Sequence, residues 1–295
     1  MRRPAPESLS DIRHPGPVAE DRRPHASCLA EPVILELADG QPLLSALGSW
    51  AEREGFGSAV LDLGGLSLQP FNFVMPDRAI DDRHAAWYSD THSSGGVALE
   101  EAVAILGWRD GNWFAHIHAY WYENGQARLG HLLPETLTIA RSAQLKGFGL
   151  KGARFVAEPD PETEFTLFRV KQDQLRPSNL DHNAIITTLA PFEDMHESIA
   201  ALADCLGDTT YDVFGLGSFA GAQFDDGQTM PGLISEILVR PGAGRGQNQN
   251  LNLPVRCVDL TGKIYEGTVK PAGAPTLVTC ELLLMAQSTS QSVET

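Results

Sequence analysis

The chain has few cysteines, and none are arranged for chemistry. Its four cysteines, Cys28, Cys205, Cys257 and Cys280, are far apart among 295 residues and form no CxxC pair. This spacing gives no sign of a disulfide framework or a thiolate metal site, and it suits a reducing cytoplasm. We therefore expect four buried apolar thiols.

Basic residues are also scarce. The chain carries 22 Lys+Arg against 38 Asp+Glu, so its formal net charge is −16 and its pI is near 4.9. Non-specific affinity for nucleic acids comes from Lys and Arg that neutralise phosphates. The charge balance therefore argues against a nucleic-acid partner.

Long apolar runs and the common nucleotide motifs are absent too. No run reaches the roughly 18 apolar residues that a membrane span needs. The N-terminus begins with two arginines after Met1 but lacks the apolar stretch of a secretory signal. No Walker A and no GxSxG occurs; residues 147–152 match GxGxxG, but a strand-like segment follows them, so we expect a glycine-rich turn. We expect a cytoplasmic protein without a membrane segment.

One segment, residues 113–131, carries three histidines in a pattern typical of a β-hairpin. His116 and His118 alternate across Ile117, so a strand would point both to the same face. Glu-Asn-Gly at residues 123–125 supplies a turn, and a second strand then delivers His131. Three imidazoles suit zinc or another borderline divalent metal ion, with one coordination position left open. The alternative is an ordinary hairpin with surface or core histidines, because His-x-His alone is common.

The same hairpin resembles the plant and prokaryote conserved (PPC) domain, which has two alternating histidines followed by a Gly-His-Leu run, here residues 130–132. Residues 38–47, 57–66 and 101–107 resemble other parts of that domain, so the resemblance covers about residues 33–155. It implies an α+β fold, usually trimeric, with the histidine cluster near a subunit interface. Some prokaryotic members resemble metal proteins, whereas plant members bind DNA through AT-hooks.

The AT-hook sequence Arg-Gly-Arg-Pro is missing from this chain. Residues 1–4 and 22–24 contain arginine and proline but are too short to form one. This departure from the plant members agrees with the acidic charge and puts DNA binding in doubt.

The two halves of the chain are similar to each other at low identity. Residues 45–56 parallel 198–207 as short amphipathic helices, and residues 125–134 parallel 262–271. In this register Thr268 stands where His131 stood, and residues 253–260 replace the strand of His116 and His118. We expect one duplicated fold whose second copy caps, pairs with or shapes the pocket of the first. The alternative is that the hairpin has no function, in which case its histidines would also vary between the two copies.

The expected fold class is α+β, with two PPC-like domains that each consist of a mainly antiparallel sheet with a few short helices on one face. Strands are expected at 33–37, 59–63, 98–106 and 113–121, and a helix at 43–54. The proposed order is an irregular arm at 1–32, the histidine-bearing domain at 33–170, a linker at 171–183, the second domain at 184–288 and a tail at 289–295.

An inserted segment at residues 81–96 concentrates side chains that often bind ligands. It lies directly before an expected strand, and loops placed by a rigid sheet frequently carry functional groups. Arg83 could hold a substrate carboxylate through a bidentate pair. Tyr88 or His84 could act as acid or base.

Further candidates lie in the arm and on the strands. The rigid sequence Arg-His-Pro-Gly-Pro at residues 13–17 could cross a pocket and deliver Arg13 or His14 to it, or it could be a solvated tail. Glu101, on the strand before the hairpin, could be a general base, a fourth metal ligand or a solvated glutamate. Trp121 could line the substrate pocket.

These features together predict a metal-dependent enzyme. The metal ion, zinc as first choice, would act as a Lewis acid or lower the pKa of bound water to about 7. Hydrolysis, hydration or dehydration, decarboxylation or isomerisation of a small anionic organic acid would fit. The alternative is a non-enzymatic binding or regulatory protein, with a DNA or protein partner and a structural metal. In either case we expect a homo-oligomer, such as a trimer.

Overall fold

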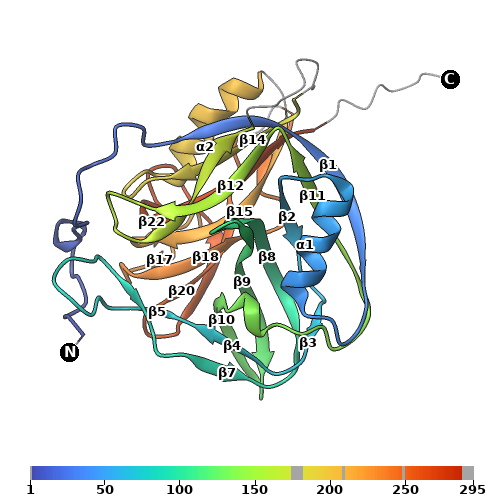
Figure 1. Ribbon diagram of the computed structural model, residues 1–295. Coiled ribbons are helices and arrows are strands. Elements are labelled where there is room, and N and C mark those ends of the chain that lie inside the picture. Colours follow the sequence, from blue (N-terminus) through green and yellow to red (C-terminus); the bar gives the residue numbers. More distant parts are fainter. Residues whose placement is uncertain (1, 174–181, 208–209, 248–249, 288–295) are drawn as a thin grey trace.

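The computed structural model describes residues 2–173, 182–207, 210–247 and 250–287. These residues form a mainly antiparallel β-sheet structure with two α-helices, α1 (Leu43–Glu54) and α2 (Met195–Ala203) (Figure 1). The expected antiparallel architecture is confirmed, whereas the small helical share makes α+β only a loose description. No helix in the described ranges is long and apolar enough to cross a membrane.

The first half contains most of the strands. They are β1 (His25–Leu37), β2 (Ser58–Asp62), β3 (Ser67–Leu68), β4 (Phe71–Val74), β5 (Pro76–Asp77), β6 (Trp87–Tyr88), β7 (His92–Ser94), β8 (Val97–Arg109), β9 (Asn112–Glu123), β10 (Gln126–Leu132), β11 (Ala143–Lys151), β12 (Ala153–Pro159) and β13 (Thr166–Gln172). Short 3-10 helices cover Leu9–Asp11 and Pro134–Thr136. The expected helix at 43–54 and the strand character expected at 33–37, 59–63, 98–106 and 113–121 are confirmed.

The second half repeats the pattern, with fewer strands among its described residues. They are β14 (Ala184–Leu189), β15 (Tyr211–Phe219), β16 (Ala222–Gln223), β17 (Thr229–Met230), β18 (Ser235–Val239), β19 (Gly244–Arg245), β20 (Pro254–Asp259), β21 (Ile264–Thr268) and β22 (Thr276–Ala286). A 3-10 helix at Asp204–Leu206 follows α2.

Strand order is the same in both halves. Neighbouring strands in the first run β1-β11-β2-β8-β9-β10, and in the second β14-β22-β15-β18-β20-β21. Each half also places its α-helix between its first two strands along the chain. This shared topology agrees with the duplication expected from the sequence.

Strand β1 joins the two halves into one sheet. Its first four residues, 25–28, pair with β14, and residues 29–37 pair with β11. The irregular arm expected over residues 1–32 therefore ends at Pro24. The N-terminal part of the strand is hard to recognise because its buried positions are the small residues Ala26, Cys28 and Ala30, which have weak β-propensity or little bulk. Most of the expected linker, residues 174–181, and the expected tail lie outside the described residues.

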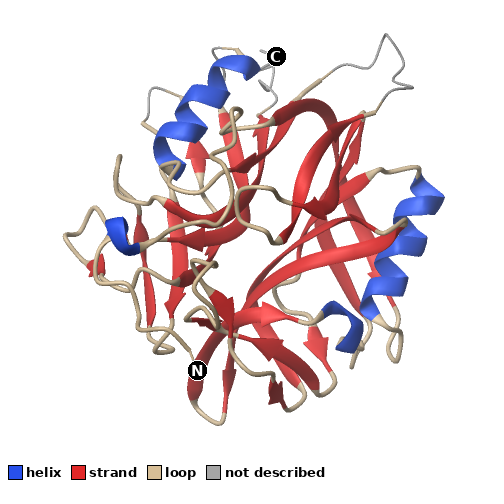
Figure 2. Cartoon of the chain, turned by 60° about the vertical axis from the view of Figure 1, so that its left-hand side comes forward, coloured by secondary structure: helices blue, strands red, loops and turns tan. Residues whose placement is uncertain are grey.

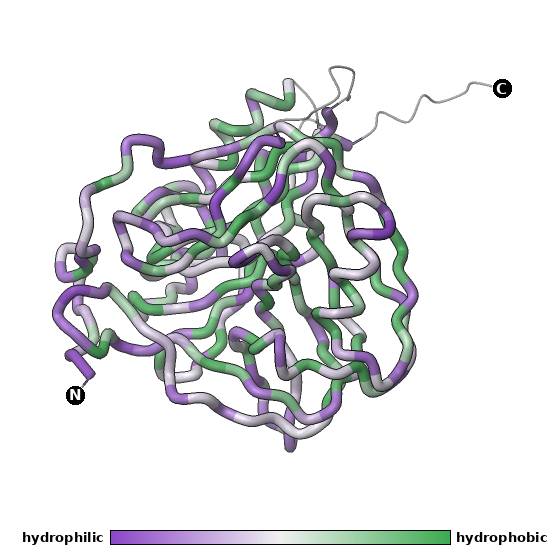
Figure 3. Tube along the Cα trace, in the orientation of Figure 1, coloured by the Kyte–Doolittle hydropathy of each residue, from purple (hydrophilic) through white to green (hydrophobic). Residues whose placement is uncertain are grey.

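Each α-helix buries one face on the sheet of its own half. In α1 the buried residues Leu43, Leu47, Trp50 and Ala51 recur at helical spacing, and the helix ends at Gly55, whose φ is 71°. In α2 the side chain of Asp194 caps the N-terminus. The two helices lie on the outside of the molecule (Figure 2), and hydrophobic residues follow the interior strands (Figure 3).

The GxGxxG segment at residues 147–152 is not a turn, because most of it lies in β11. A Cβ atom at Gly147 would overlap the carbonyl oxygen of Val60, and one at Gly149 would overlap the ring of Phe56. The glycines are thus required by close packing of the strand, which explains the motif without a nucleotide.

The expectation of buried thiols is confirmed for three cysteines and is wrong for the fourth. Cys28, Cys257 and Cys280 are buried, whereas Cys205 is exposed. Cys205 lies in the 3-10 helix that ends the α2 segment, where the chain leaves the apolar face of the helix.

Candidate metal centre

The hairpin of β9 and β10 brings the three histidines together. His116 and His118 occupy alternate positions of β9, and His131 of β10 pairs directly with His118. The ring centroid of His116 lies 4.7 Å from the ring centroid of His118 and 4.7 Å from that of His131. Each ring has a nitrogen atom that lies within 4.8 Å of a nitrogen atom of the other two, so the three histidines could bind a metal ion.

The second half has no such group at the matching place. If Gly267 is matched with Gly130, the strand pairing puts Thr268 opposite Pro254, where the first half has His131 opposite His118. The register expected from the sequence matched Val255 with His118, whereas the strand pairing matches Pro254 with it. The expected register was therefore wrong by one residue in β20, because the loop between β20 and β21 is longer than the two-residue turn of the first hairpin.

Hydrogen bonds fix which ring nitrogens are free. His118 Nδ1 lies 2.8 Å from the carbonyl oxygen of Ile237, and His116 Nδ1 lies 2.7 Å from a carboxylate oxygen of Glu281. Both partners are acceptors, so each Nδ1 must carry a proton. In the neutral rings both Nε2 atoms then present lone pairs, and these atoms lie only 3.1 Å apart. Two lone pairs facing each other at this distance repel, so either a metal ion or a proton must lie between them.

The protonation states of His118 and His131 also favour a bound metal ion. Burial and the neighbouring His116 hold the pKa of His118 well below its ordinary value. Burial and the other two histidines lower the pKa of His131 in the same way. Both rings are therefore neutral at physiological pH, and neutral imidazole is the form that binds a metal ion.

Three groups that surround the histidines come from the second half. Glu281 lies on β22, and Glu236 and Ile237 lie on β18. Glu236 Oε1 is 4.0 Å from His118 Nε2, while Glu236 Oε2 is buried without a hydrogen-bond partner. Burial raises the pKa of Glu236 well above its ordinary value. The sequence analysis missed both glutamates, although each is a charged residue in an otherwise buried apolar strand, which is a recognisable signal.

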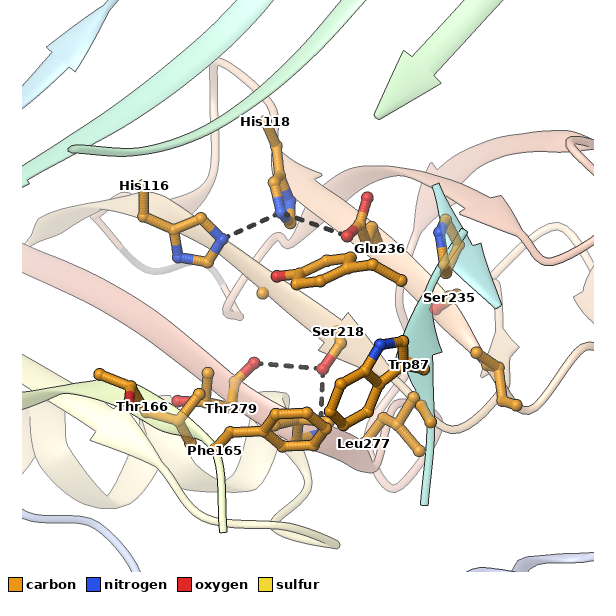
Figure 4. A pocket seen from close by; sticks show the side chains of 17 residues that line it. Trp87, His116, His118, Phe165, Thr166, Ser218, Ser235, Glu236, Leu277 and Thr279 are labelled. Carbon is orange, nitrogen blue, oxygen red and sulfur yellow. Dashed lines mark hydrogen bonds and ion pairs between the residues drawn. The ribbon is translucent and has the colours of Figure 1, made fainter. Parts of the chain in front are cut away.

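A cavity of about 110 Å³ opens in front of His116 and His118 (Figure 4). Apolar side chains, among them Trp87, Phe165 and Leu277, form much of its wall. Its polar lining includes Glu236 and the side chains of Ser218, Ser235, Thr279 and Thr166. Both halves contribute, so the cavity lies at the junction between them.

Tyr88 is the candidate acid or base that the structure brings to the histidines. Its hydroxyl lies 3.2 Å from Nδ1 of His131. Burial of the hydroxyl, together with the carboxylates of Glu236 and Glu281, raises its pKa above the ordinary value for tyrosine. The phenol is therefore protonated and can donate a proton or a hydrogen bond.

His84 and Arg83 lie behind or outside the cavity wall. His84 Nδ1 bonds to the carboxylate of Asp81, and its ring packs 4.8 Å from that of Trp87 and 4.9 Å from that of Phe165. Arg83 is ion-paired with Glu164. Neither candidate lines the cavity, although His84 supports two side chains that do.

The N-terminal arm docks against the outside of the same wall. His14 Nε2 bonds to the carbonyl oxygen of Leu277 at 2.9 Å, and Ile12 is buried in a cluster that includes Leu277 and Ile234. Arg13 is exposed and borders a different, surface pocket. The arm is thus held in place, but it delivers neither Arg13 nor His14 to the cavity.

Glu101 binds arginines of the other half instead of facing the histidines. One of its carboxylate oxygens lies 2.8 Å from Arg240 Nη2, and the other lies 3.1 Å from Arg256 Nη1. It borders a separate groove between the halves, and this groove contains none of the three histidines.

Trp121 is a core residue of the first half. It is completely buried and packs against the rings of Phe71 and Phe73. Its position follows from strand alternation, because in β9 the odd-numbered residues Ile117 and Ala119 face the same core.

Comparisons with known proteins give similarities to solved structures alone. No family model and no curated protein matches the chain. A candidate DNA-binding protein from Ralstonia eutropha JMP134 is 20% identical with a TM-score of 0.37, and the match covers 48% of this chain and 90% of that one. A metal-containing protein from Archaeoglobus fulgidus is 16% identical with a TM-score of 0.38, covering 49% and 96%.

A plant- and prokaryote-conserved protein from Pyrococcus horikoshii is also similar. It is 16% identical with a TM-score of 0.36, and the match covers 48% of this chain and 94% of that one. The solved structures similar to this chain thus include a protein of the family that residues 113–131 resemble. Each of these matches spans about half of the chain.

Proposed function

We propose that His116, His118 and His131 bind one divalent metal ion, with zinc as first choice, and that this ion faces a cavity for a small organic molecule. The observation that carries the proposal is the 3.1 Å separation of the Nε2 atoms of His116 and His118. Two nitrogen ligands of a tetrahedral zinc ion lie about 3.3 Å apart, given zinc–nitrogen bonds of about 2.0–2.1 Å.

The surroundings of the rings fit a metal ion as well. Histidines that bind metals usually donate their second ring N–H to a carboxylate or a carbonyl, which fixes the tautomer. Glu281 does this for His116, and the carbonyl of Ile237 does it for His118. If His131 donates its Nδ1 proton to the hydroxyl oxygen of Tyr88, its Nε2 is free in the same way.

In this proposal the protein is a metal-dependent enzyme of the hydrolase, lyase or isomerase type. The bound metal ion would supply a Lewis acid, or a water acidified to a pKa of about 7. Glu236 and Tyr88 take the proton-transfer roles, because their oxygen atoms lie beside the histidines. Glu101 and His84 are left out because both are held by other charged groups.

The second candidate is a non-enzymatic binding or regulatory protein with a structural metal ion. It is favoured by the 4.0 Å distance between Glu236 Oε1 and His118 Nε2, since a small movement would make this carboxylate a fourth ligand and close the site. The Ralstonia protein similar to this chain is described as a candidate DNA-binding protein. A net charge of −16 favours a protein partner over DNA for the present chain.

Cobalt(II) separates the two functions, because its visible spectrum reports the number and geometry of its ligands. The full chain is loaded with cobalt(II) and titrated with imidazole, a small neutral ligand. An open site predicts a spectral change that saturates, whereas a site closed by Glu236 predicts an unchanged spectrum. The variant Glu236→Gln is the matched control: if Glu236 closes the site, this variant alone should respond to imidazole.

A further inference from the structure

We propose that the N-terminal arm, residues 2–24, is a strap that closes the cavity in front of the histidines, and that a ligand enters when the arm moves away at Ile12. This inference rests on the proposed function, because a cavity that binds a small molecule needs an entry route. It concerns access to that cavity, and its test needs no metal ion.

A second pocket, here called the outer pocket, lies between the arm and residues 79–85 and measures about 330 Å³. Ile234 lines both the outer pocket and the cavity. Ala85 lines the outer pocket, and the next residue, Ala86, lines the cavity. The two spaces therefore lie back to back with a thin wall of side chains between them. Ile234 is completely buried, so this wall is closed in the structure.

Ile12 of the arm packs against this wall from the outer side. Its side chain is buried in a cluster with Ala86, Ile234 and Leu277, and all three of these residues line the cavity. Two residues further along the arm, His14 Nε2 lies 2.9 Å from the carbonyl oxygen of Leu277. The arm thus covers the wall at the point where the cavity comes nearest to the outer pocket.

The arm also binds the neighbouring segments that carry lining residues. Arg2 Nε lies 2.9 Å from a carboxylate oxygen of Asp77, and Arg2 Nη1 lies 3.1 Å from the carbonyl oxygen of Tyr88. The backbone N–H of Gly16 donates to the carbonyl oxygen of Glu162 at 2.9 Å, in the loop before β13. One continuous arm therefore connects the three segments that form this side of the cavity, which are residues 76–88, 165–167 and 277–279.

The arm can move without unfolding the sheet. Residues 2–24 form no strand, since β1 begins at His25. Ile12 is the one buried residue of this described segment, and its other contacts are ion pairs and single hydrogen bonds. Segments with few buried apolar contacts open at a lower free-energy cost than core strands do. The packing of Ile12 therefore decides how often the arm opens.

The test measures how quickly a small reagent reaches the cavity. Thr279→Cys places a thiol in the lining of the full chain, and Cys205→Ser removes the exposed thiol. Metal ions are removed with a chelator, methyl methanethiosulfonate is added, and mass spectrometry gives the rate of labelling at position 279. Ile12→Ala weakens the packing of the arm, so labelling should become at least about tenfold faster. The control Val18→Ala changes an arm residue that is 75% exposed, and it should leave the rate unchanged.

Two results would overturn the proposal. One is an unchanged labelling rate in Ile12→Ala. The other is rapid labelling while Ile12 is intact, because the cavity would then be open without any movement of the arm. If Thr279→Cys does not fold, hydrogen exchange of the chain with Ile12→Ala alone takes its place. The amide of Gly16 should then exchange at least about tenfold faster than in the wild type, and an unchanged rate would contradict the role of Ile12.

Zinc content of the untreated protein keeps the two proposals apart. A protein without zinc in which Ile12→Ala accelerates labelling would reject the metal function and retain the strap. A zinc-containing protein in which Ile12→Ala changes neither labelling nor exchange would do the reverse.

Discussion

At the scale of single residues, the histidines were predictable and the glutamates were not. Strand alternation and a two-residue turn are local rules, and they place His116, His118 and His131 on one face from the sequence alone. Glu236 and Glu281 reach this face only because the two halves pack together, which no local pattern specifies. The same limit explains why Glu101 was expected near the metal, although two arginines of the second half hold it.

The contact between Glu281 and His116 should tune metal affinity. Glu281→Gln keeps the size of the side chain but weakens the hydrogen bond to His116 Nδ1, so we expect zinc affinity to fall about 10- to 100-fold. Competition with a zinc-binding dye measures the change. An affinity equal to that of the wild type would show that Glu281 does not hold the ring for metal binding.

The four thiols should differ in reactivity. Burial raises the pKa of Cys28 and of Cys280 to about 12, and it raises that of Cys257 as well. Since the thiolate is the reactive form, only Cys205 should react rapidly with an aromatic disulfide reagent in the native protein. Rapid reaction of more than one thiol before denaturant is added would be inconsistent with this structure.

At the scale of elements, long periodic segments were predictable and pairings between the halves were not. Helix α1 and strands β8 and β9 have strong apolar patterns, and their positions agree with the expected ones. The N-terminal part of β1 was missed because Ala26, Cys28 and Ala30 gain their strand structure from pairing with β14 and β11. The register of β20 was missed because loop length between strands is variable.

The ion pairs of Glu101 should stabilise the junction between the halves without affecting the metal. Glu101→Gln leaves Arg240 and Arg256 without their shared carboxylate, so the free energy of unfolding should fall by about 1–3 kcal/mol. The lower part of this range is expected, because the Glu101 side chain is 22% exposed. Urea unfolding and zinc analysis measure the two effects, with Glu100→Gln as the exposed control. Loss of zinc in Glu101→Gln would contradict this expectation and would show that Glu101 contributes to the metal site.

At the scale of the whole molecule, the second half completes the site of the first. The PPC resemblance implies a histidine cluster near a subunit interface, whereas here the neighbouring half of the same chain supplies Glu236 and Glu281. One chain therefore contains every group that the proposed site needs. An assembly of several chains stays a prediction.

The acidic charge should prevent binding to nucleic acids. With a formal net charge of −16, we expect no measurable affinity for duplex DNA at physiological salt. Fluorescence anisotropy of a labelled duplex tests this. Tight binding that weakens steeply with added salt would reveal a basic surface and favour a regulatory function.

The most direct test of the central claim is the metal content of protein purified without an affinity tag or added metal. The wild type is compared with His116→Ala/His118→Ala and with His25→Ala/His92→Ala, a control that changes two exposed histidines. The proposed site predicts about one metal ion per chain in the wild type and in the control, and almost none in the first variant while its circular dichroism is unchanged. A metal-free wild type that also fails to bind added zinc, cobalt or nickel tightly would contradict the account.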